Sequence, residues 1–368
     1  PSAPASADEI AYYFRVLLKE IRSFEALDSL HTVTTVFFGG GTPSMVNPQY
    51  IEQVMNLLRT QYHFDKDIEI TLEANPGTLT KESLAAYRGM GIGRLSLGLQ
   101  SVHEDELKML GRIHSYPDFL KSYDAARNAG FGNINVDLMS GLPRQTMDKW
   151  RETLETVAAL EPEHISAYSL IIEEGTPFAG TWGTRQGRIY LPGEKLDREM
   201  YHFTKGFLAE RGFSRYEISN YAKKGQQCRH NMTYWTCGEY IGFGQSAASY
   251  VDGRRFQNPA EKTAYWNYSR SAYASFKAAR PLSLKEKEED NKEIIKNRLN
   301  VNWAEDKYKL DLALLIDKRK LDIEIDAEMY HKTWNSELCY RDQLRNQRLI
   351  EQGWSIKRFW AYQIRDNL

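Results

Sequence analysis

Cysteine is scarce in this chain, and the other features that it lacks exclude several classes of protein. The 368 residues include three cysteines, Cys228, Cys237 and Cys339, whose wide spacing fits neither a disulfide framework nor a closed zinc site. No apolar run approaches the ~20 residues that a membrane helix needs, and the first residues lack the regions of a signal peptide. The formal net charge is -1, so no strong overall field points to nucleic acid or membrane. We expect a cytoplasmic protein of two or three domains.

The most distinctive stretch joins a short apolar run to three consecutive glycines. Residues 33–38 are β-branched or aromatic and predict a buried strand. Residues 39–43, Gly-Gly-Gly-Thr-Pro, follow directly, and glycine lets a ligand approach the backbone because it has no Cβ. Asn47 and Pro48 predict the start of a helix. Taken alone, the stretch is equally consistent with a tight strand-to-helix turn.

Strand and helix patterns then alternate at a spacing of roughly 30 residues, which predicts a parallel sheet, open or closed into a barrel. An amphipathic helix is expected first, at Ala7–Leu27. The predicted strands are Val33–Phe38, Ile68–Leu72, Arg94–Gly98, Asn133–Met139 and His164–Leu170. The predicted helices between and after them are Tyr50–Gln61, Lys81–Met90, Asp105–Leu110, Asp118–Asn128, Met147–Leu160 and Lys195–Glu210. A further strand is expected at Arg215–Tyr221.

Polar and turn-forming residues stand at the carboxyl end of every predicted strand of this series. Ligands bind at that end of parallel sheets, so this convergence predicts a pocket. The residues are Gly39–Thr42, Glu73–Pro76, Gln100–Ser101, Asp137 with Gly141–Pro143, and Tyr168–Ser169.

Eight motifs occur in a fixed order along this part of the chain. They are GGGTPS, LEANPG, LSLGLQS, GRIHS, INVDLMSGLP, HISAYSL, YEISNYA and CRHNMTYW. In this order they resemble the oxygen-independent coproporphyrinogen oxidase branch of the radical S-adenosylmethionine superfamily, and within it the HemW-type haem chaperones. The resemblance covers about residues 10–288. It implies an α/β fold, a partial (βα)6 barrel with S-adenosylmethionine at its open end, and a link to haem or porphyrin metabolism.

The resemblance also implies roles for single residues at the strand ends. Backbone and side-chain groups of the glycine-rich loop would contact the amino and carboxylate groups of the methionine, and an acid on the second strand would bind its amino group. Three further residues would hold carboxylate, ribose or neighbouring polar groups. In order, these positions are Gly40, Gly41 and Thr42, then Glu73, then Gln100, Arg112 and Asp137. The alternatives are a helix-capping role for Glu73 and a surface ion pair for Arg112.

The chain departs from this family at its defining motif. Family members carry a Cys-x3-Cys-x2-Cys loop after a first strand, and its three thiolates hold a [4Fe–4S] cluster whose fourth iron site binds S-adenosylmethionine. No cysteine precedes Cys228 here. We therefore expect a barrel that lacks its first strand and its cluster ligands and does no radical chemistry. His230 is the candidate haem contact, with a hydrogen-bonded structural histidine as the alternative.

The last sixty or so residues show a different pattern. Strands are expected at Tyr308–Ile316, Lys320–Asp326 and Ser355–Phe359, with a helix at Leu338–Glu351. This order resembles the restriction-endonuclease-like fold, and more narrowly the Vsr-like domains. The resemblance implies that Asp311 and Glu324 bind Mg²⁺ and that the tail contacts nucleic acid. Asp326 stands where that fold more often has lysine, and a solvated acidic strand face is the alternative.

These patterns predict four segments. Residues 1–212 would form the truncated barrel, and residues 213–282 a HemW-like segment that follows it. Residues 283–306 would form a charged linker, because the region around 285–296 is dense in charge. Residues 307–368 would form the small endonuclease-like αβ domain. The expected function is that of a haem-linked or porphyrin-linked radical S-adenosylmethionine family protein, either coproporphyrinogen oxidase-like or a haem chaperone; the alternative is a nucleic-acid processing module.

Overall fold

A computed structural model describes residues 5–24, 31–172, 175–268, 272, 310–316, 319–326 and 354–360. The chain divides into two units, residues 1–291 and 292–368, each of which is described by itself. The first unit includes both the predicted barrel and the segment after it.

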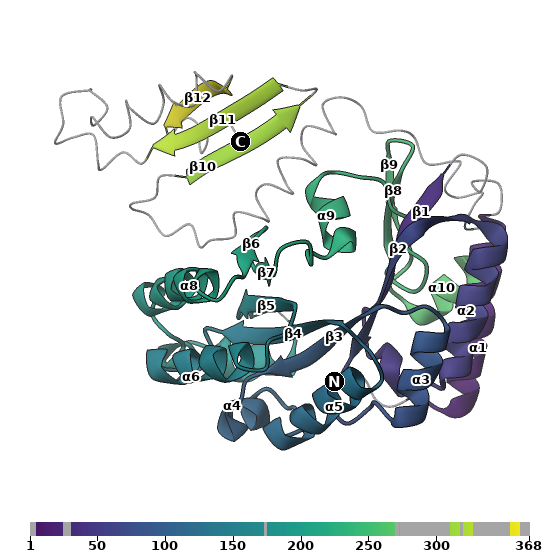
Figure 1. Cartoon of the computed structure of the whole chain (residues 1–368), viewed down its shortest axis with the longest axis horizontal. Coiled ribbons are helices and arrows are strands. Elements are labelled where there is room, and N and C mark those ends of the chain that lie inside the picture. The colour runs from purple at the N-terminus through teal and green to yellow at the C-terminus, as the bar shows by residue number, and fades with distance from the viewer. Residues whose placement is uncertain are drawn as a thin grey trace. The chain divides into compact units, whose positions relative to one another are not determined.

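The first unit is built on a sheet in the order β1-β2-β3-β4-β5-β7-β6. Five parallel strands come first: β1 (Thr32–Phe38), β2 (His63–Ala74), β3 (Arg94–Gln100), β4 (Asn133–Ser140) and β5 (His164–Ser169). The short strands β6 (Ser214–Arg215) and β7 (Asn220–Ala222) close the series, and β7 runs antiparallel to β5. The sheet curls, with helices along its outer side (Figure 1). The predicted α/β partial barrel is confirmed.

Helices connect the strands as the sequence pattern predicts, because their apolar faces pack on the sheet and their first turns are capped. Side chains of Ser6, Asn47, Thr80, Ser115 and Thr146 accept hydrogen bonds at five helix starts. The helices are α1 (Ala7–Ser23), α2 (Pro48–Gln61), α3 (Lys81–Gly89), α4 (Glu104–Met109), α5 (Tyr116–Asn128), α6 (Met147–Ala158), α7 (Pro177–Trp182), α8 (Glu194–Ala209), α9 (Arg229–Trp235) and α10 (Lys262–Tyr268). Of these, α7, α9 and α10 were not predicted. Short 3-10 turns occur at Pro43–Met45 and Arg188–Tyr190.

The two faces of the sheet differ sharply in chemistry. Successive side chains of a strand point to opposite faces. One set on β3 and β4 is wholly apolar and forms the core with the helices: Leu95, Leu97, Leu99, Ile134, Val136 and Leu138. The alternate set is polar and hydrogen-bonds within itself: Ser96, Asn135, Asp137, His164 and Ser166. We call the face of the sheet that carries this second set the inner face. It also includes the side chains of β1 to β5 that pair with these residues across neighbouring strands.

A buried carboxylate fastens the segment after the barrel to α1. Glu20 is 1% exposed, and it accepts hydrogen bonds from the Gly244 amide at 3.0 Å, Asn258 Nδ2 at 2.7 Å and the Tyr265 hydroxyl at 2.6 Å. Burial raises the pKa of Glu20, and the three donors oppose that rise. The strands β8 (Ala248–Val251) and β9 (Arg254–Gln257) lie in this fastened segment.

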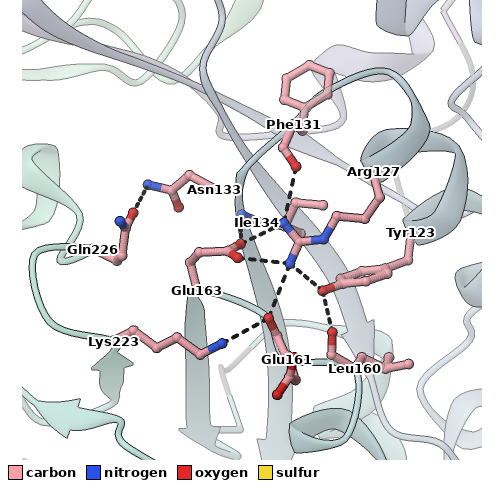
Figure 2. Close-up of polar contacts among 10 residues, drawn as sticks. All are labelled: Tyr123, Arg127, Phe131, Asn133, Ile134, Leu160, Glu161, Glu163, Lys223 and Gln226. Carbon is pink, nitrogen blue, oxygen red and sulfur yellow. Dashed lines mark hydrogen bonds and ion pairs between the residues drawn. The ribbon is translucent and has the colours of Figure 1, made fainter.

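An ion pair joins elements at the amino ends of β4 and β5 (Figure 2). Arg127 of α5 donates to both oxygens of Glu163, at 2.8 and 3.1 Å. The Ile134 amide donates to the same carboxylate at 2.9 Å, and Lys223 Nζ donates to the Glu161 carbonyl at 3.1 Å. The network therefore ties α5, β4 and the loops before β5 and after β7 at the end of the sheet opposite the predicted pocket.

One predicted strand of this unit is wrong. Residues 215–221 were expected to form a single strand, but they form a hairpin in which Arg215 pairs with Tyr221. The turn forms because the Glu217 side chain accepts a hydrogen bond from the Ser219 amide at 2.8 Å. Polar and apolar residues do alternate here, but they belong to the two short strands of the hairpin rather than to one continuous strand.

The second unit contributes three described strands, β10 (Leu310–Ile316), β11 (Arg319–Asp326) and β12 (Trp354–Trp360). β10 pairs antiparallel with β11, and β11 pairs parallel with β12. The three predicted strands are confirmed, whereas the predicted helix at 338–351 and the linker at 283–306 lie outside the described residues. The endonuclease-like fold of this unit stays a prediction.

Candidate functional site

The glycine-rich loop after β1 lies against Glu73 at the end of β2. The Gly40 amide donates to Glu73 Oε2 at 3.2 Å, and Gly40 has a φ of 84°, which favours glycine. A Cβ at Gly39 would lie 2.8 Å from Glu73 Cδ, so glycine is needed there too. A Cβ at Gly40 or Gly41 would have nothing within 4 Å. The backbone of this loop is therefore open for a ligand beside a carboxylate.

Glu73 and Asp137 are two carboxyl groups that influence each other, and the charges of Arg94 and Arg112 also act on Asp137. Burial, followed by the charge of Asp137, raises the pKa of Glu73 to about 7, and the Gly40 amide opposes the rise. Burial also raises the pKa of Asp137, although Asn135 and Ser96 donate hydrogen bonds to it at 2.8 and 3.0 Å. Among the described residues, neither carboxylate has an ion pair. A cationic ligand group would stabilise both charges.

The remaining predicted residues of this site lie at the same edge of the sheet. Thr42 Oγ1 accepts from Asn75 Nδ2 at 3.0 Å, next to the glycine-rich loop. Gln100 ends β3 in a left-handed conformation with φ of 73°, a strain of the kind found at ligand sites. Arg112 is half-buried; burial lowers its pKa and the charge of Asp137 opposes that. The structure brings these side chains together, while their ligand roles stay predictions.

Sequence reasoning missed the polar chain that holds Asp137. The Tyr216 hydroxyl lies 2.8 Å from His164 Nε2, and His164 Nδ1 lies 2.6 Å from Asn135 Oδ1. Asn135 in turn donates through Nδ2 to Asp137 Oδ1. Burial lowers the pKa of His164 well below its ordinary value, so the ring is neutral. Because Asn135 Oδ1 accepts, Nδ1 carries the proton and Nε2 accepts from Tyr216. The alternation of polar residues within β4 and β5 was the signal for this chain.

His230, the candidate haem contact, lies near the start of α9 against β1. Its Nδ1 lies 2.9 Å from Thr35 Oγ1, its Nε2 lies 2.9 Å from the Tyr234 hydroxyl, and its ring stacks on Phe37 at 5.0 Å. Burial lowers its pKa to about 4, so the ring is neutral. Neutral imidazole is the form that binds metals. Both nitrogens are engaged, so a haem iron at Nε2 would replace the tyrosine contact.

Neither described cysteine offers a cluster site. Cys228 is buried, its thiol lies 3.5 Å from Glu69 Oε1, and burial raises its pKa to about 11. Cys237 is exposed, and Cys339 lies outside the described residues. A [4Fe–4S] cluster needs several thiolates from one site, which these two residues do not supply.

In the second unit, the backbone register pairs Asp311 with Glu324, the two residues predicted to bind Mg²⁺. Asp326 pairs with Trp360 on the other neighbouring strand. The register is compatible with the prediction, and Mg²⁺ binding and nucleic-acid contact stay predictions.

Comparisons with known proteins agree with the first unit. The model of the radical SAM superfamily matches residues 4–157. The heme chaperone HemW of Bacillus subtilis is 36% identical over 247 residues, which are 67% of this chain and 65% of that protein. The mitochondrial radical S-adenosyl methionine domain-containing protein 1 of Bos taurus is 39% identical over 66% of this chain and 54% of its own length. The chain thus spans less than two thirds of the length of these relatives.

The fold has a counterpart among solved structures. Coproporphyrinogen III oxidase of Escherichia coli, described as a radical SAM enzyme, superposes with a TM-score of 0.62 at 24% identity, over 71% of this chain and 62% of that one. Within the described ranges, no helix combines the length and apolar character needed to cross a membrane. The radical SAM superfamily model and these relatives show that residues 4–157 are a radical S-adenosylmethionine superfamily domain, similar to that of the HemW-type group.

Proposed function

We propose that the first unit binds S-adenosylmethionine at the carboxyl ends of β1 to β4 and that its physiological partner is haem or a related porphyrin. The observation that carries the first part is the Glu73 carboxyl group, which accepts from the Gly40 amide beside open glycine backbone, feels the charge of Asp137 and forms no ion pair with any described residue. S-adenosylmethionine bears an ammonium and a sulfonium, and both would favour this environment.

Each residue of the site has a part that suits its chemistry. Glu73 would accept from the ammonium group, and the open backbone at Gly40 and Gly41 would let the methionine lie close to the loop. Arg112 and Gln100 would donate to the carboxylate, and Asp137 would accept from the ribose hydroxyls. The described cysteines do not fit a [4Fe–4S] cluster, so ligand binding, rather than a radical step, is the activity proposed for these residues.

The haem part of the proposal is supported by the printed names of the relatives, heme chaperones among them. It is also supported by the neutral ring of His230, stacked on Phe37 beside the inner face. Location in the cytoplasm remains part of the proposal.

Calorimetric titration with S-adenosylmethionine tests the first part. The wild-type protein should bind S-adenosylmethionine. Glu73→Gln should bind it at least about tenfold more weakly, because a charge-assisted hydrogen bond is lost. The control Glu155→Gln, at an exposed position of α6, should bind as the wild type does. Because the carboxylate is the binding form, affinity should rise as the pH increases through about 7. Equal binding by Glu73→Gln would reject this site.

Absorbance titration with haem tests the second part. A Soret shift at micromolar haem that is lost in His230→Ala supports His230 as the contact, whereas a shift retained in that variant moves the contact elsewhere. Wild-type protein without any shift would remove haem from the proposal.

A further inference from the structure

A buried arginine without a partner lies on the inner face. Arg94 is the first residue of β3 and is 3% exposed. Its Nε is fully buried and has no hydrogen-bond partner, and no hydrogen bond or ion pair joins its side chain to another residue in the part of the chain that the structure describes. A buried charge without a partner costs several kcal/mol, so such a residue calls for an anion.

The register neighbours of Arg94 on both sides are also unsatisfied. Arg94 pairs with Thr71 of β2 and with Asn133 of β4. Thr71 Oγ1 and Asn133 Oδ1 are buried without a hydrogen-bond partner among the described residues. Asn133 Nδ2 donates to Gln226 Oε1 at 3.1 Å (Figure 2), whereas Asn133 Oδ1 has no hydrogen-bond partner among the described residues. Three adjacent strands therefore present unsatisfied polar atoms at one level of the sheet, which marks a place for polar ligand atoms or water.

Two carboxylates of the inner face, Asp137 and Glu69, already accept hydrogen bonds from other groups. Both oxygens of Asp137 accept hydrogen bonds, from Ser96 and Asn135. The oxygens of Glu69 accept from the backbone amides of Arg229 and His230 at the start of α9, at 3.0 and 3.1 Å. Neither forms an ion pair with Arg94, so the protein does not supply the missing anion from these groups.

The surroundings of Arg94 indicate which anion it takes. Its positive charge helps to lower the pKa of His164 and of His230, the candidate haem contact. Its charge also lowers the pKa of Asp137. In the sheet, Arg94 pairs with Thr71, and Thr71 pairs with Phe37, on which the ring of His230 stacks. Glu73 lies two residues nearer the carboxyl end of β2, so Arg94 is level with the His230 contact rather than with the place proposed for the methionine amino group. A planar guanidinium matches a carboxylate with two parallel hydrogen bonds.

We propose that Arg94 is a carboxylate-binding residue of the inner face and that it takes a propionate of the tetrapyrrole. The inference rests on the haem part of the proposed function. The other source of a carboxylate is the methionine of S-adenosylmethionine, and the experiment separates the two.

Haem and its dimethyl ester, in which both propionates are neutral, are titrated into the wild-type protein, Arg94→Gln, Arg94→Lys and the exposed control Arg185→Gln. Wild type and Arg185→Gln should bind haem about 10- to 100-fold more tightly than the ester. Arg94→Gln should bind the two equally, and Arg94→Lys should keep part of the preference. S-adenosylmethionine affinity should change less than about twofold in Arg94→Gln.

Wild-type protein that binds haem and the ester equally would overturn the role of Arg94 and leave haem binding intact, without the need for any variant to fold. A preference kept in Arg94→Gln would overturn it as well. Loss of S-adenosylmethionine binding in Arg94→Gln with an unchanged haem preference would assign Arg94 to the methionine carboxylate. Wild-type protein that binds neither porphyrin would instead reject the haem part of the proposed function, and this inference with it.

Discussion

Glu73→Gln should make the protein more stable at neutral and alkaline pH while it weakens ligand binding. The wild-type carboxyl group is held in a place that penalises its charge, because it is desolvated and lies near Asp137. Glutamine is nearly isosteric and keeps an oxygen that can accept from the Gly40 amide. The substitution therefore removes the charge and little else.

The size and pH range of the effect follow from the pKa. The pKa of Glu73 is about 7 in the folded protein against 4.5 ordinarily. Below pH 4.5 the group is protonated in both states and nothing is lost. Between pH 4.5 and about 7 the unfolded state has released a proton that the folded state still binds, so the free energy of unfolding falls across this range. The full loss is about 3 kcal/mol above pH 7. Glu73→Gln escapes this loss.

Urea unfolding at pH 5 and at pH 8 measures the effect. The free energy of unfolding of the wild type should fall relative to Glu73→Gln by about 2–3 kcal/mol between these values. Glu155→Gln, exposed on α6, is the control and should follow the wild type. Parallel pH curves for the wild type and Glu73→Gln would refute the reasoning, since they would mean that Glu73 is charged without penalty and that no cation is called for.

Three further predictions concern the polar networks of the first unit. Glu20→Ala leaves the donors around that carboxylate without an acceptor and should lower the free energy of unfolding by about 3 kcal/mol or more; a loss below about 1 kcal/mol in urea unfolding contradicts the network. Arg127→Met should lower the free energy of unfolding by about 2–3 kcal/mol in the same assay. Lys121→Met, whose ion pair is exposed, should lower it by less than about 0.5 kcal/mol. Equal losses in the two variants would count against a special role for Arg127. Nitrogen NMR at pH 6 should show His164 neutral with its proton on Nδ1, and a protonated Nε2 would disprove the assigned chain.

The outer architecture of the first unit could be predicted from local patterns. Strand and helix periodicity, cap residues and the ordered motifs are all written in short stretches of sequence, and they place Glu73 and Asp137 at one edge of a parallel sheet. The hairpin at 215–221 was missed because the alternation of polar and apolar residues does not distinguish a single strand from two short paired strands joined by a turn. The turn depends on a side-chain contact of Glu217 with the backbone.

The networks could not be predicted because they depend on register and on contacts between distant segments. His164 reaches Asn135 only because β4 and β5 pair with those two residues side by side. Glu20 meets its partners more than two hundred residues further along the chain. Neither pairing leaves a mark in the sequence near the residues themselves. The polar alternation within the strands was visible, however, and it would have identified the inner face as polar before the structure did.

The inner face buries charged groups at a cost in free energy of folding, and this cost is the strongest reason to regard it as a binding surface. The apolar outer face of the sheet is held by the hydrophobic core, which needs no particular partner. The inner face instead holds Asp137 and Glu73 with raised pKa values and Arg94 without an anion. The charge of Arg94 favours the ionised form of Asp137, but among the described residues Arg94 forms no ion pair with either acid. A stable scaffold could replace all three by apolar residues, so their presence indicates ligands that complete them: a cation beside Glu73 and an anion at Arg94.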